Sequence, residues 1–498
     1  AYFDNHEKGN GQEVGSCGVD YRQSLEDLGS PEDCVINYRK APEFPIDGGL
    51  LPNTFFNRNE GHMHSLNVDV PLGEFRLTSV SGYNDLKSDW SADADWGALP
   101  FFNIFRPERY EQFSQEIRLQ SPVDRRLSFL VGGYYAHADR RMNQNVDAAA
   151  FGVTFFRRMN VDIDEFAAFG EATLQVTPEL SLIAGGRYTH VKQKGERIQD
   201  GGLLGNFEID YPGSDYYQSE RLKSNDFSPS VTLQYQFSPS AQVFASYKQG
   251  FKAGGFDLDR EVADTFAYGD ESAEGFEIGA KAELFGRMMV SAAAFLTDVS
   301  DLQVQTYLGT EPVTLIQNAA ETRVKGFEIE AMVRATQDLT LNLNMGYVDG
   351  KYRSFPNAPC TTGQAASGFC PNFPPTQDLS GGRLPMTPKY TFSAGFDYTR
   401  PLTDSHALAV SANVSHRSSV FLTLENDPLA SSDKLTLVDA RIALEPVDGG
   451  SGFTAAIVSR NLFNEKYVSS GIALPGPDSF VFQVGMPRTV ELQFGYQF

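Results

Sequence analysis

The sequence predicts an all-β protein, a transmembrane antiparallel β-barrel, and three observations support this fold class. Apolar and polar residues alternate along many segments, tight turns recur, and long polar connections separate the segments. Alternate side chains of a strand point to opposite faces of a sheet. Each segment therefore forms a strand with one apolar face and one polar face, as a barrel between lipid and a wet interior requires.

The last ten residues, 489–498, show this alternation most completely. One set of alternate positions is apolar and ends in aromatics, namely Val490, Leu492, Phe494, Tyr496 and Phe498. The other set is polar or glycine. We expect a terminal strand whose apolar face meets lipid.

The earlier strands begin at about Met63, after an irregular stretch. We expect residues 1–62 to be an extracellular loop region that precedes the first strand, and residues 63–498 to be barrel. Alternation and turn residues predict roughly seventeen strands in the second part. The clearest lie at 63–71, 75–83, 113–121, 127–137, 165–176, 231–237, 276–284, 327–333, 339–347, 387–399, 406–418, 434–445 and 453–468.

Short and long connections fall at opposite ends of these strands. Tight turns are expected at 71–73, 122–126, 177–179, 238–240, 285–287 and 336–338, and long polar connections at 194–222, 252–269, 353–383 and 469–486. Bacterial outer-membrane barrels have short periplasmic turns and long extracellular loops. A propeller or an immunoglobulin-like array would not separate its connections in this way.

Charged residues lie in the middle of strands on the polar faces. They are Glu116, Arg118, Glu171, Glu277, Lys281, Glu283, Glu328, Glu330 and Glu491. A charged Arg or Lys facing lipid at mid-membrane costs ~2–4 kcal/mol. We therefore expect these side chains to face the barrel interior.

Composition excludes some classes of partner. The 498 residues are 41% hydrophobic, with a formal net charge of -23. Phosphate recognition in nucleic acids needs a basic surface, so no nucleic-acid partner is expected. The acidity serves solubility and loop solvation or, alternatively, attracts cations or cationic complexes. The sequence contains no apolar run of ~18 residues, so no transmembrane helix is expected.

The 4 cysteines fall into two local pairs, Cys17 with Cys34 and Cys360 with Cys370. Their spacing differs from that of zinc-binding cysteines, and no histidines cluster near them. We expect two loop disulfides formed in an oxidising compartment, with four unpaired thiols as the alternative.

Several stretches resemble one family. They are residues 113–121 (FSQEIRLQS), 131–135 (VGGYY), 246–256 (SYKQGFKAGGF), 318–330 (NAAETRVKGFEIE) and 461–467 (NLFNEKY), followed by 487–490 (PRTV) and the terminal Phe498. In this order and spacing, they resemble the TonB-dependent receptors of Gram-negative outer membranes. The resemblance covers about residues 63–498.

The resemblance implies a barrel of about 22 strands closed around an N-terminal plug. The seventeen strands expected here would be the last of these, so the plug and the first five strands would be absent from this sequence. Residue 1 does not begin a signal peptide, so either a leader was removed or the chain starts partway into a longer protein.

The implied function is energy-coupled uptake of a scarce nutrient through the outer membrane. A ferric siderophore is the expected ligand, and a corrinoid, haem or an oligosaccharide are alternatives. The expected partners are outer-membrane lipid, the TonB energy-coupling protein acting through the absent plug, and the barrel-assembly machinery, which would recognise the strand ending at Phe498. Without the plug, this chain alone should not be competent for transport.

The candidate ligand-binding residues are aromatic and basic and lie in or beside the long connections. Aromatic faces suit planar or catecholate-like ligands, and arginine suits an anionic complex. The alternative is that these aromatics form the interfacial girdle or fold the loop on itself. The candidates are Trp90, Trp96, Phe101, Phe102, Phe105, Arg106, Arg109, Tyr110, Tyr216, Tyr217, Phe251, Lys252 and Phe256.

No catalytic constellation, cofactor motif or metal-binding motif is expected. His62 and His64 would share one side of a strand, which is more typical of a structural or solvated pair than of a metal site. His137, His190 and His416 are expected to be structural strand histidines. The other hypotheses are a passive porin or surface-binding barrel without energy coupling, a soluble secreted β-protein, and an enzyme embedded in a barrel.

Overall fold

The computed structural model describes residues 2–8, 13–16, 56–93, 103–148, 153–203, 216–258, 266–307, 314–370, 375–447, 450–473 and 479–498. This part of the chain consists of strands, turns and a short helix, α2 (Thr362–Ala366). No helix among these residues is both long enough and apolar enough to cross a bilayer.

The main sheet consists of long antiparallel strands. They are β1 (Tyr2–Lys8), β3 (Phe56–Leu72), β4 (Phe75–Asp93), β5 (Asn103–Gln120), β6 (Leu127–Ala148), β7 (Val153–Gln175), β8 (Leu180–Leu203), β9 (Tyr216–Ser238), β10 (Ala241–Lys252), β13 (Glu271–Leu284), β14 (Met288–Tyr307), β15 (Thr314–Arg334), β16 (Leu339–Ser354), β19 (Tyr390–Pro401), β20 (His406–Arg417), β23 (Leu435–Pro446), β24 (Gly452–Arg460) and β27 (Thr489–Gln497).

The shorter strands lie at one end of this sheet. They are β2 (Glu13–Ser16), β11 (Gly255–Phe256), β12 (Ala267–Tyr268), β17 (Ala358–Pro359), β18 (Thr376–Gln377), β21 (Val420–Phe421), β22 (Ser431–Ser432), β25 (Val468–Ala473) and β26 (Ser479–Val484). β11 pairs with β12, β17 with β18 and β21 with β22, while β26 lies between β2 and β25.

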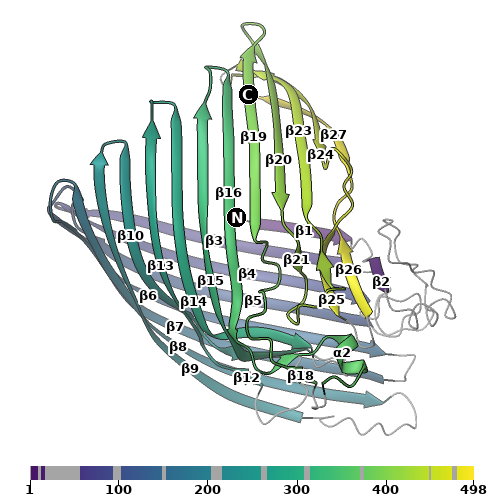
Figure 1. The fold of residues 1–498 in the computed structure, drawn as a ribbon. Coiled ribbons are helices and arrows are strands. Elements are labelled where there is room, and N and C mark those ends of the chain that lie inside the picture. The colour runs from purple at the N-terminus through teal and green to yellow at the C-terminus, as the bar shows by residue number, and fades with distance from the viewer. Residues whose placement is uncertain are drawn as a thin grey trace.

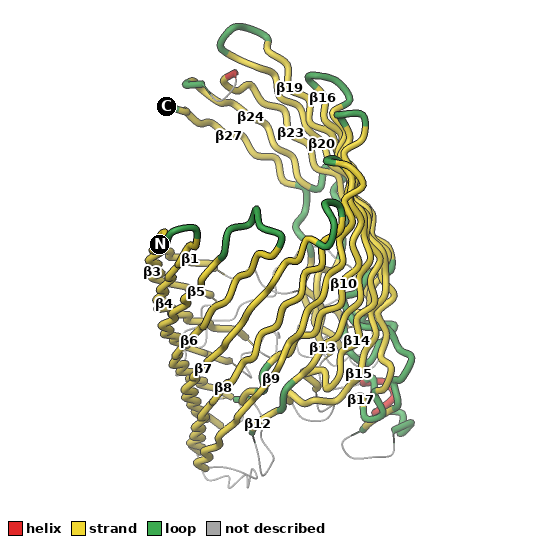
Figure 2. The backbone as a smooth tube through the Cα atoms, turned by 90° about the vertical axis from the view of Figure 1, so that its left-hand side faces the viewer, coloured by secondary structure: helices red, strands yellow, loops and turns green. Residues whose placement is uncertain are grey.

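Among the described residues, the main sheet has 18 strands, and 17 of them run from β3 to β27, as the sequence predicts. Each strand from β3 onward pairs with the next in chain order, and β1 pairs with the upper part of β3. Figures 1 and 2 show the result as one strongly curved wall, with β1 and β3 at one margin and β27 at the other. We call its two surfaces the convex and the concave face.

The convex face carries the apolar half of each strand. Ile117 is 52% exposed and Ile278 63% exposed, and both are on the faces predicted to meet lipid. Tyr83, Phe113 and Phe166 are also exposed on this surface. An apolar band edged by aromatics is the outer surface of an outer-membrane barrel.

The concave face carries the mid-strand charges. Glu277, Glu328 and Glu330 occupy positions opposite in parity to the apolar residues Phe276, Phe327 and Ile329. The other predicted mid-strand charges follow the same alternation in their own strands. The polar half of each strand therefore faces the interior, as predicted.

The short turns lie at one end of the sheet and the long connections at the other. The turn between β3 and β4 contains Gly73 at φ +65°, and the turn between β13 and β14 contains Gly286 at φ +63°. These left-handed conformations suit glycine, which has no Cβ to clash. The predicted separation of short and long connections is confirmed, and the end with the long connections is the one predicted to be extracellular.

Several predicted boundaries are wrong because strands continue beyond the apolar band. The first predicted strand begins at Phe56 rather than Met63, and the strand predicted at 113–121 begins at Asn103. Residues 194–203 and 216–222 are strand rather than loop. Residues 469–486 include much of a hairpin, β25 and β26, and the strand predicted at 453–468 ends at Arg460. Beyond the apolar band, lipid no longer requires one face of a strand to be apolar, so the alternation on which the prediction rests disappears.

Candidate functional site

The candidate site is the concave face at the extracellular end of β4, β5 and β6. Trp90 on β4 and Arg106 on β5 are direct cross-strand partners. The guanidinium carbon of Arg106 lies 6.0 Å from the centroid of the Trp90 ring, and its Nη2 donates to Oε1 of Gln144 on β6 at 2.7 Å. The Trp90 side chain is 37% exposed, so it can contact a ligand. These three side chains form a cation–aromatic–amide unit.

A second set of side chains continues this strip along the same face. Glu108 and Tyr110 follow Arg106 at alternate positions of β5 and therefore share its face. The Nε atom of Arg140 on β6 donates to Oε1 of Glu108 at 2.7 Å, and Arg140 lies opposite Tyr110. The strip is thus partly neutralised at its lower end and more cationic near Arg106.

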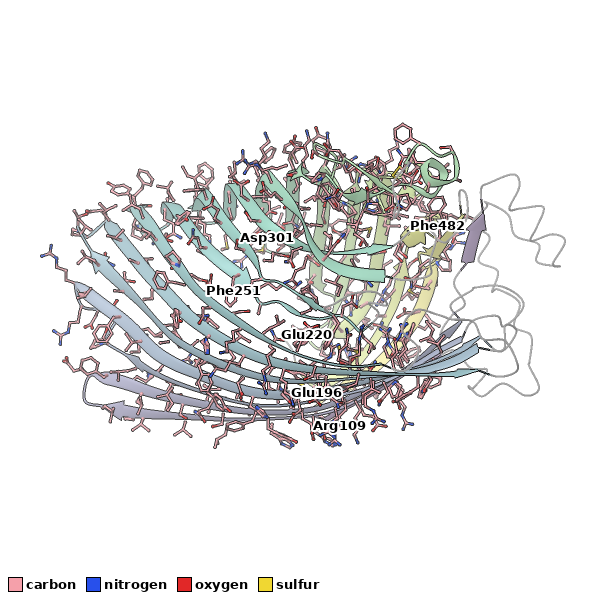
Figure 3. The ribbon with its side chains drawn as sticks, turned by 90° about the horizontal axis from the view of Figure 1, so that it is seen from below. Arg109, Glu196, Glu220, Phe251, Asp301 and Phe482 are labelled. Atoms are coloured by element: carbon pink, nitrogen blue, oxygen red, sulfur yellow. A yellow bond between two sulfur atoms is a disulfide. The ribbon has the colours of Figure 1, made fainter. Side chains whose placement is uncertain are left out.

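The other predicted residues do not all join this strip. Arg109 has the opposite parity to Arg106, and Figure 3 shows it on the convex side of the sheet. Its guanidinium pairs there with Asp85 at 3.3 Å and Glu111 at 2.6 Å. Phe105 has the same parity as Arg109, with its ring 6.2 Å from that of Phe56. The single aromatic and basic cluster expected from the sequence is therefore divided between two faces.

The remaining candidates are dispersed. Tyr217 is 61% exposed on the convex face, with the parity of Phe227. Phe251 is at the top of β10 on the face that carries Tyr247, and Lys252 is next to it with the opposite parity. The residues Trp96, Phe101 and Phe102, and the side chain of Tyr216, lie outside the described part of the chain.

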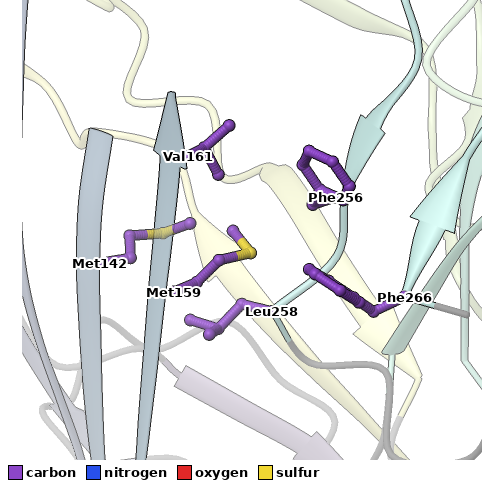
Figure 4. Packing of buried hydrophobic residues seen from close by; sticks show 6 residues of the cluster. All are labelled: Met142, Met159, Val161, Phe256, Leu258 and Phe266. Carbon is purple, nitrogen blue, oxygen red and sulfur yellow. The ribbon is translucent and has the colours of Figure 1, made fainter. Parts of the chain in front are cut away.

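Phe256, predicted as a ligand-binding residue, is instead buried in a hydrophobic cluster. It is 7% exposed and belongs to a cluster with Met142, Met159, Leu258 and Phe266, shown in Figure 4. Gly195 of β8 permits this approach, because a Cβ there would come within 2.7 Å of the Phe256 ring. The segment that follows β10 therefore folds inward against the concave wall of β6 to β8, and we call residues 253–258 with 266–270 the inner segment.

Arg197 of β8 anchors the inner segment. Its Nη1 donates to the carbonyl oxygens of Asp257 at 3.2 Å and Leu258 at 3.3 Å, while its Nη2 donates to Oε1 of Gln218 at 2.6 Å. The guanidinium carbon also lies 5.1 Å from the Phe266 ring centroid. A buried arginine is stable only when several acceptors share its charge, as they do here.

Asn318 of β15 anchors the other side of the inner segment. Its Nδ2 donates to the carbonyl oxygens of Gly269 and Asp270 at 3.0 Å and of Asp301 at 2.9 Å, and its Oδ1 accepts from the Gly269 N–H at 2.7 Å. Asn318 begins the motif 318–330 singled out in the sequence, but its structural role depends on contacts far along the chain. Arg197 and Gln193, which donates to the Gly254 carbonyl at 2.7 Å, had no sequence signal beyond their position on a polar strand.

A different arrangement stabilises the connection between β16 and β19. Cys360 and Cys370 form a disulfide, which confirms one of the two predicted pairs; Cys17 and Cys34 lie outside the described residues. Helix α2 begins with a capping box between Thr361 and Gln364. Tyr352, Phe355 and Ala358, at the end of β16 and the start of the connection, belong to a buried cluster. Burial raises the pKa of Glu425, in the connection between β20 and β23 that packs beside this cluster.

The predicted histidines lie on strands, and the structure adds no ligand set to them. His64 stacks near Tyr83, with ring centroids 6.5 Å apart, and His137 Nδ1 lies 3.0 Å from Asp164 Oδ1. His190 contacts Asn225, and His416 contacts Thr436. In the described ranges, no group of three His, Cys, Asp or Glu side chains has a geometry suited to a metal ion.

Comparison with known proteins identifies the family of this fold. A family profile described as "TonB dependent receptor-like, beta-barrel" matches residues 20–462. Among curated proteins, the metal-pseudopaline receptor CntO of Pseudomonas aeruginosa is 29% identical over 128 residues, which are 25% of this chain and 17% of that protein.

Solved structures show the same fold at low identity. The ferric yersiniabactin uptake receptor FyuA from Yersinia pestis has a TM-score of 0.74 at 18% identity, over 91% of this chain and 63% of that one. The siderophore receptor PiuA from Acinetobacter baumannii has a TM-score of 0.70 at 15% identity, over 100% of this chain and 71% of that one. The copper transporter OprC also matches, with a TM-score of 0.63 at 14% identity, over 89% of this chain and 66% of that one. This chain thus spans roughly two thirds of the solved relatives and a sixth of the curated one.

Proposed function

This chain belongs to the TonB-dependent receptor β-barrel family, whose members are Gram-negative outer-membrane transporters and not enzymes, and from that premise we propose that it forms the barrel portion of a receptor for a ferric siderophore. The extracellular loops would capture the ligand and the concave wall would hold it. Energy coupling would act through a plug domain contacted by the TonB protein, and barrel assembly would use the strand that ends at Phe498. The alternative is a passive porin or surface-binding barrel.

The unit formed by Trp90, Arg106 and Gln144 is the observation that supports this proposal. Its guanidinium offers charge-assisted hydrogen bonds to an anionic complex, and its exposed indole offers a flat face to a planar chelator. Solved relatives include receptors named for ferric yersiniabactin and ferric catecholates, but also a ferric citrate and a copper transporter. The fold is therefore compatible with several ligands, and the choice among them depends on side chains.

A pair of arginine variants tests the proposal with a matched control. Arg106→Gln and Arg109→Gln remove the same charge three residues apart, but on opposite faces of β5. The chain, purified in detergent, would be titrated with ferric tris-catecholate, ferric citrate and Cu²⁺, with tryptophan fluorescence as the readout. We expect Arg106→Gln to weaken ferric-catecholate binding roughly 10-fold or more, because a hydrogen bond to a charged group is lost. Arg109→Gln should bind within about twofold of the parent chain.

Three outcomes would contradict the proposal. Equal losses in both variants would mean that the concave strip has no special role. Preference for Cu²⁺ over both ferric complexes would assign the chain to a different cargo. Ion conductance through reconstituted bilayers without saturable ligand binding would favour the passive barrel.

A further inference from the structure

The inner segment lies directly beside the concave strip. One row of cross-strand partners crosses the concave face from β5 to β8, and its members are Tyr110, Arg140, Val161 and Gly195. The Phe256 ring of the inner segment packs against Gly195 and belongs to the same hydrophobic cluster as Val161. The inner segment therefore covers this row at β7 and β8, next to the part of the row that belongs to the strip.

A second contact connects the inner segment to β6 itself. Met142 lies two residues from Arg140 and two from Gln144, so the three side chains share the concave face. Met142 packs in the cluster with Phe256 and Leu258, as Figure 4 shows. Adjacent strands are about 4.8 Å apart, so a long side chain of the inner segment can reach a molecule bound on β5 and β6.

Tyr268 is on the side of the inner segment that faces away from the wall. β11 pairs with β12 so that Phe256 is opposite Ala267 and Gly255 is opposite Tyr268. Phe256 points toward Gly195 of the wall, and neighbouring residues of a strand point to opposite faces. A Cβ on Gly255 would come within 2.5 Å of the Tyr268 hydroxyl oxygen, so the Tyr268 side chain extends over this glycine.

The Tyr268 hydroxyl is available to a ligand. Among the described residues, it has no hydrogen-bond partner, and its side chain is partly exposed. Burial and the Asp257 carboxylate raise the pKa of Tyr268, while the nearby Arg140 guanidinium lowers it. The phenol is therefore protonated at neutral pH and can donate a hydrogen bond beside Arg140.

Hydrogen bonds fix the backbone on both sides of Tyr268. Oε1 of Glu220 on β9 accepts from the Phe266 N–H at 2.9 Å, and Oδ1 of Asn318 on β15 accepts from the Gly269 N–H at 2.7 Å. A side chain on a backbone that is ordered before binding loses less conformational entropy when it contacts a ligand. Tyr268 is thus held in position for such a contact.

Tyr268 and the concave strip offer complementary contacts. The phenol hydroxyl can donate to an anionic oxygen, and the ring can stack on a flat chelator. Trp90 offers a second aromatic face on the strip, and Arg106 offers a guanidinium. A complex with aromatic rings and anionic oxygens would use the rings and the donors, whereas an aliphatic carboxylate complex would use the donors alone.

We propose that Tyr268 contacts the ligand bound on the concave strip and favours ferric catecholates over ferric citrate. The inference rests on the proposed function, because it assigns a specificity-determining residue within the same site. The hydroxyl contributes to binding of both complexes. The ring contributes only to binding of the aromatic one, so it is the part of the side chain that selects.

Two substitutions separate the hydroxyl from the ring. The chain, purified in detergent, would be titrated with ferric tris-catecholate and with ferric citrate, with tryptophan fluorescence as the readout. We expect Tyr268→Phe to weaken binding of both complexes roughly fivefold, because one hydrogen bond is lost. Tyr268→Leu should weaken ferric tris-catecholate roughly fivefold more, because stacking is lost as well, and should bind ferric citrate as Tyr268→Phe does.

Tyr247→Phe is the matched control. The Tyr247 hydroxyl donates to Oε2 of Glu274 at 3.3 Å, and Tyr247 lies opposite Phe276 on the convex face. This variant should bind both complexes as the parent chain does. Hydrogen exchange of residues 253–258 and 266–270 should be unchanged in Tyr268→Phe, and heat-modifiable migration on gels reports folding. If Tyr268→Leu does not fold, Tyr268→Phe alone decides whether the side chain contacts the ligand.

The outcomes distinguish this inference from the proposed function. If the parent chain binds neither ferric complex, or if Arg106→Gln and Arg109→Gln lose equally, the proposed function fails and the inference fails with it. If Arg106→Gln weakens binding as expected while both Tyr268 variants bind as the parent chain does, only the inference is overturned. Equal losses for the two complexes in Tyr268→Leu would remove the selectivity, and accelerated exchange in Tyr268→Phe would show a structural role; either result also overturns it.

Discussion

The extracellular ends of two regions of the sheet differ in construction. β6 to β9 are 22 to 24 residues long, whereas β19, β20 and β23 are 12 residues each. Figure 1 shows the longer strands continuing as sheet toward the end where the short strands give way to loops. In the long region, ladder hydrogen bonds maintain the structure above the membrane. In the short region, other interactions must do so.

This difference in strand length shows that the connections at this end of the sheet can be stabilised in two independent ways. The inner segment depends on side chains of the long strands that bond to its backbone, chiefly Arg197 and Asn318. The connection after β16 depends on itself, through the disulfide between Cys360 and Cys370 and the capped helix α2. Each mechanism should therefore fail without affecting the other.

The largest effect is expected from Arg197→Leu. The substitution removes three hydrogen bonds of a buried guanidinium, to the carbonyl oxygens of Asp257 and Leu258 and to Gln218 Oε1, and the loss of such hydrogen bonds costs about 3 kcal/mol. Hydrogen exchange of residues 253–258 and 266–270 should accelerate by roughly two orders of magnitude. Ile198→Ala, on the next residue and the opposite face, is the control. Unchanged protection in Arg197→Leu would show that apolar packing alone holds the inner segment.

A somewhat smaller effect is expected from the double variant Cys360→Ala, Cys370→Ala. The disulfide closes a sequence separation of 10 residues, and cross-linking such a loop stabilises the folded state by about 2–3 kcal/mol. Exchange should accelerate in residues 354–370 and 375–384 and remain unchanged in the inner segment. Acceleration in both would disprove the independence of the two regions.

The smallest effect concerns Glu425. Burial raises the pKa of its carboxyl above the ordinary value, so its protonated form is favoured in the folded loop. The corresponding stability is present at low pH and is lost as pH rises through the raised pKa. Protection of residues 419–432, corrected for intrinsic exchange, should fall in the parent chain as pH rises above the ordinary titration range of a glutamate carboxyl. Glu425→Gln should abolish this slope, and a slope retained in the variant would assign it to another group.

The sequence predicted most of what lies within the membrane. Alternation predicted the strand count and the apolar face, because contact with lipid imposes a period of two on every strand. Turn residues and connection lengths predicted which end of the sheet carries the short turns. Residues 194–203 were predicted as loop because no such constraint acts above the membrane. Their strand state follows from pairing with β7 and β9, which alternation alone does not reveal.

The candidate site was predicted only in part for the same reason. The aromatic and basic composition of this region grouped Trp90, Arg106 and Arg109 into one cluster. The face of the sheet on which each side chain lies depends instead on where its strand starts and on an unbroken register. Phe256 was predicted to be available to a ligand, whereas its ring packs against Gly195 across 61 residues of chain. Contacts between residues so far apart in sequence cannot be predicted from the composition of either segment.

The parity of β5 has an evolutionary consequence. Even-numbered positions of β5 such as Arg106 lie on the concave face, and odd-numbered positions such as Arg109 lie on the convex face. Under the proposed function, substitutions at the first set would alter ligand preference, and the convex face would be unchanged. A one-residue insertion would exchange the two sets at once. Under the proposed function, adaptation to a new ligand would therefore proceed by replacement within these strands, and by length variation only in the segments that join them.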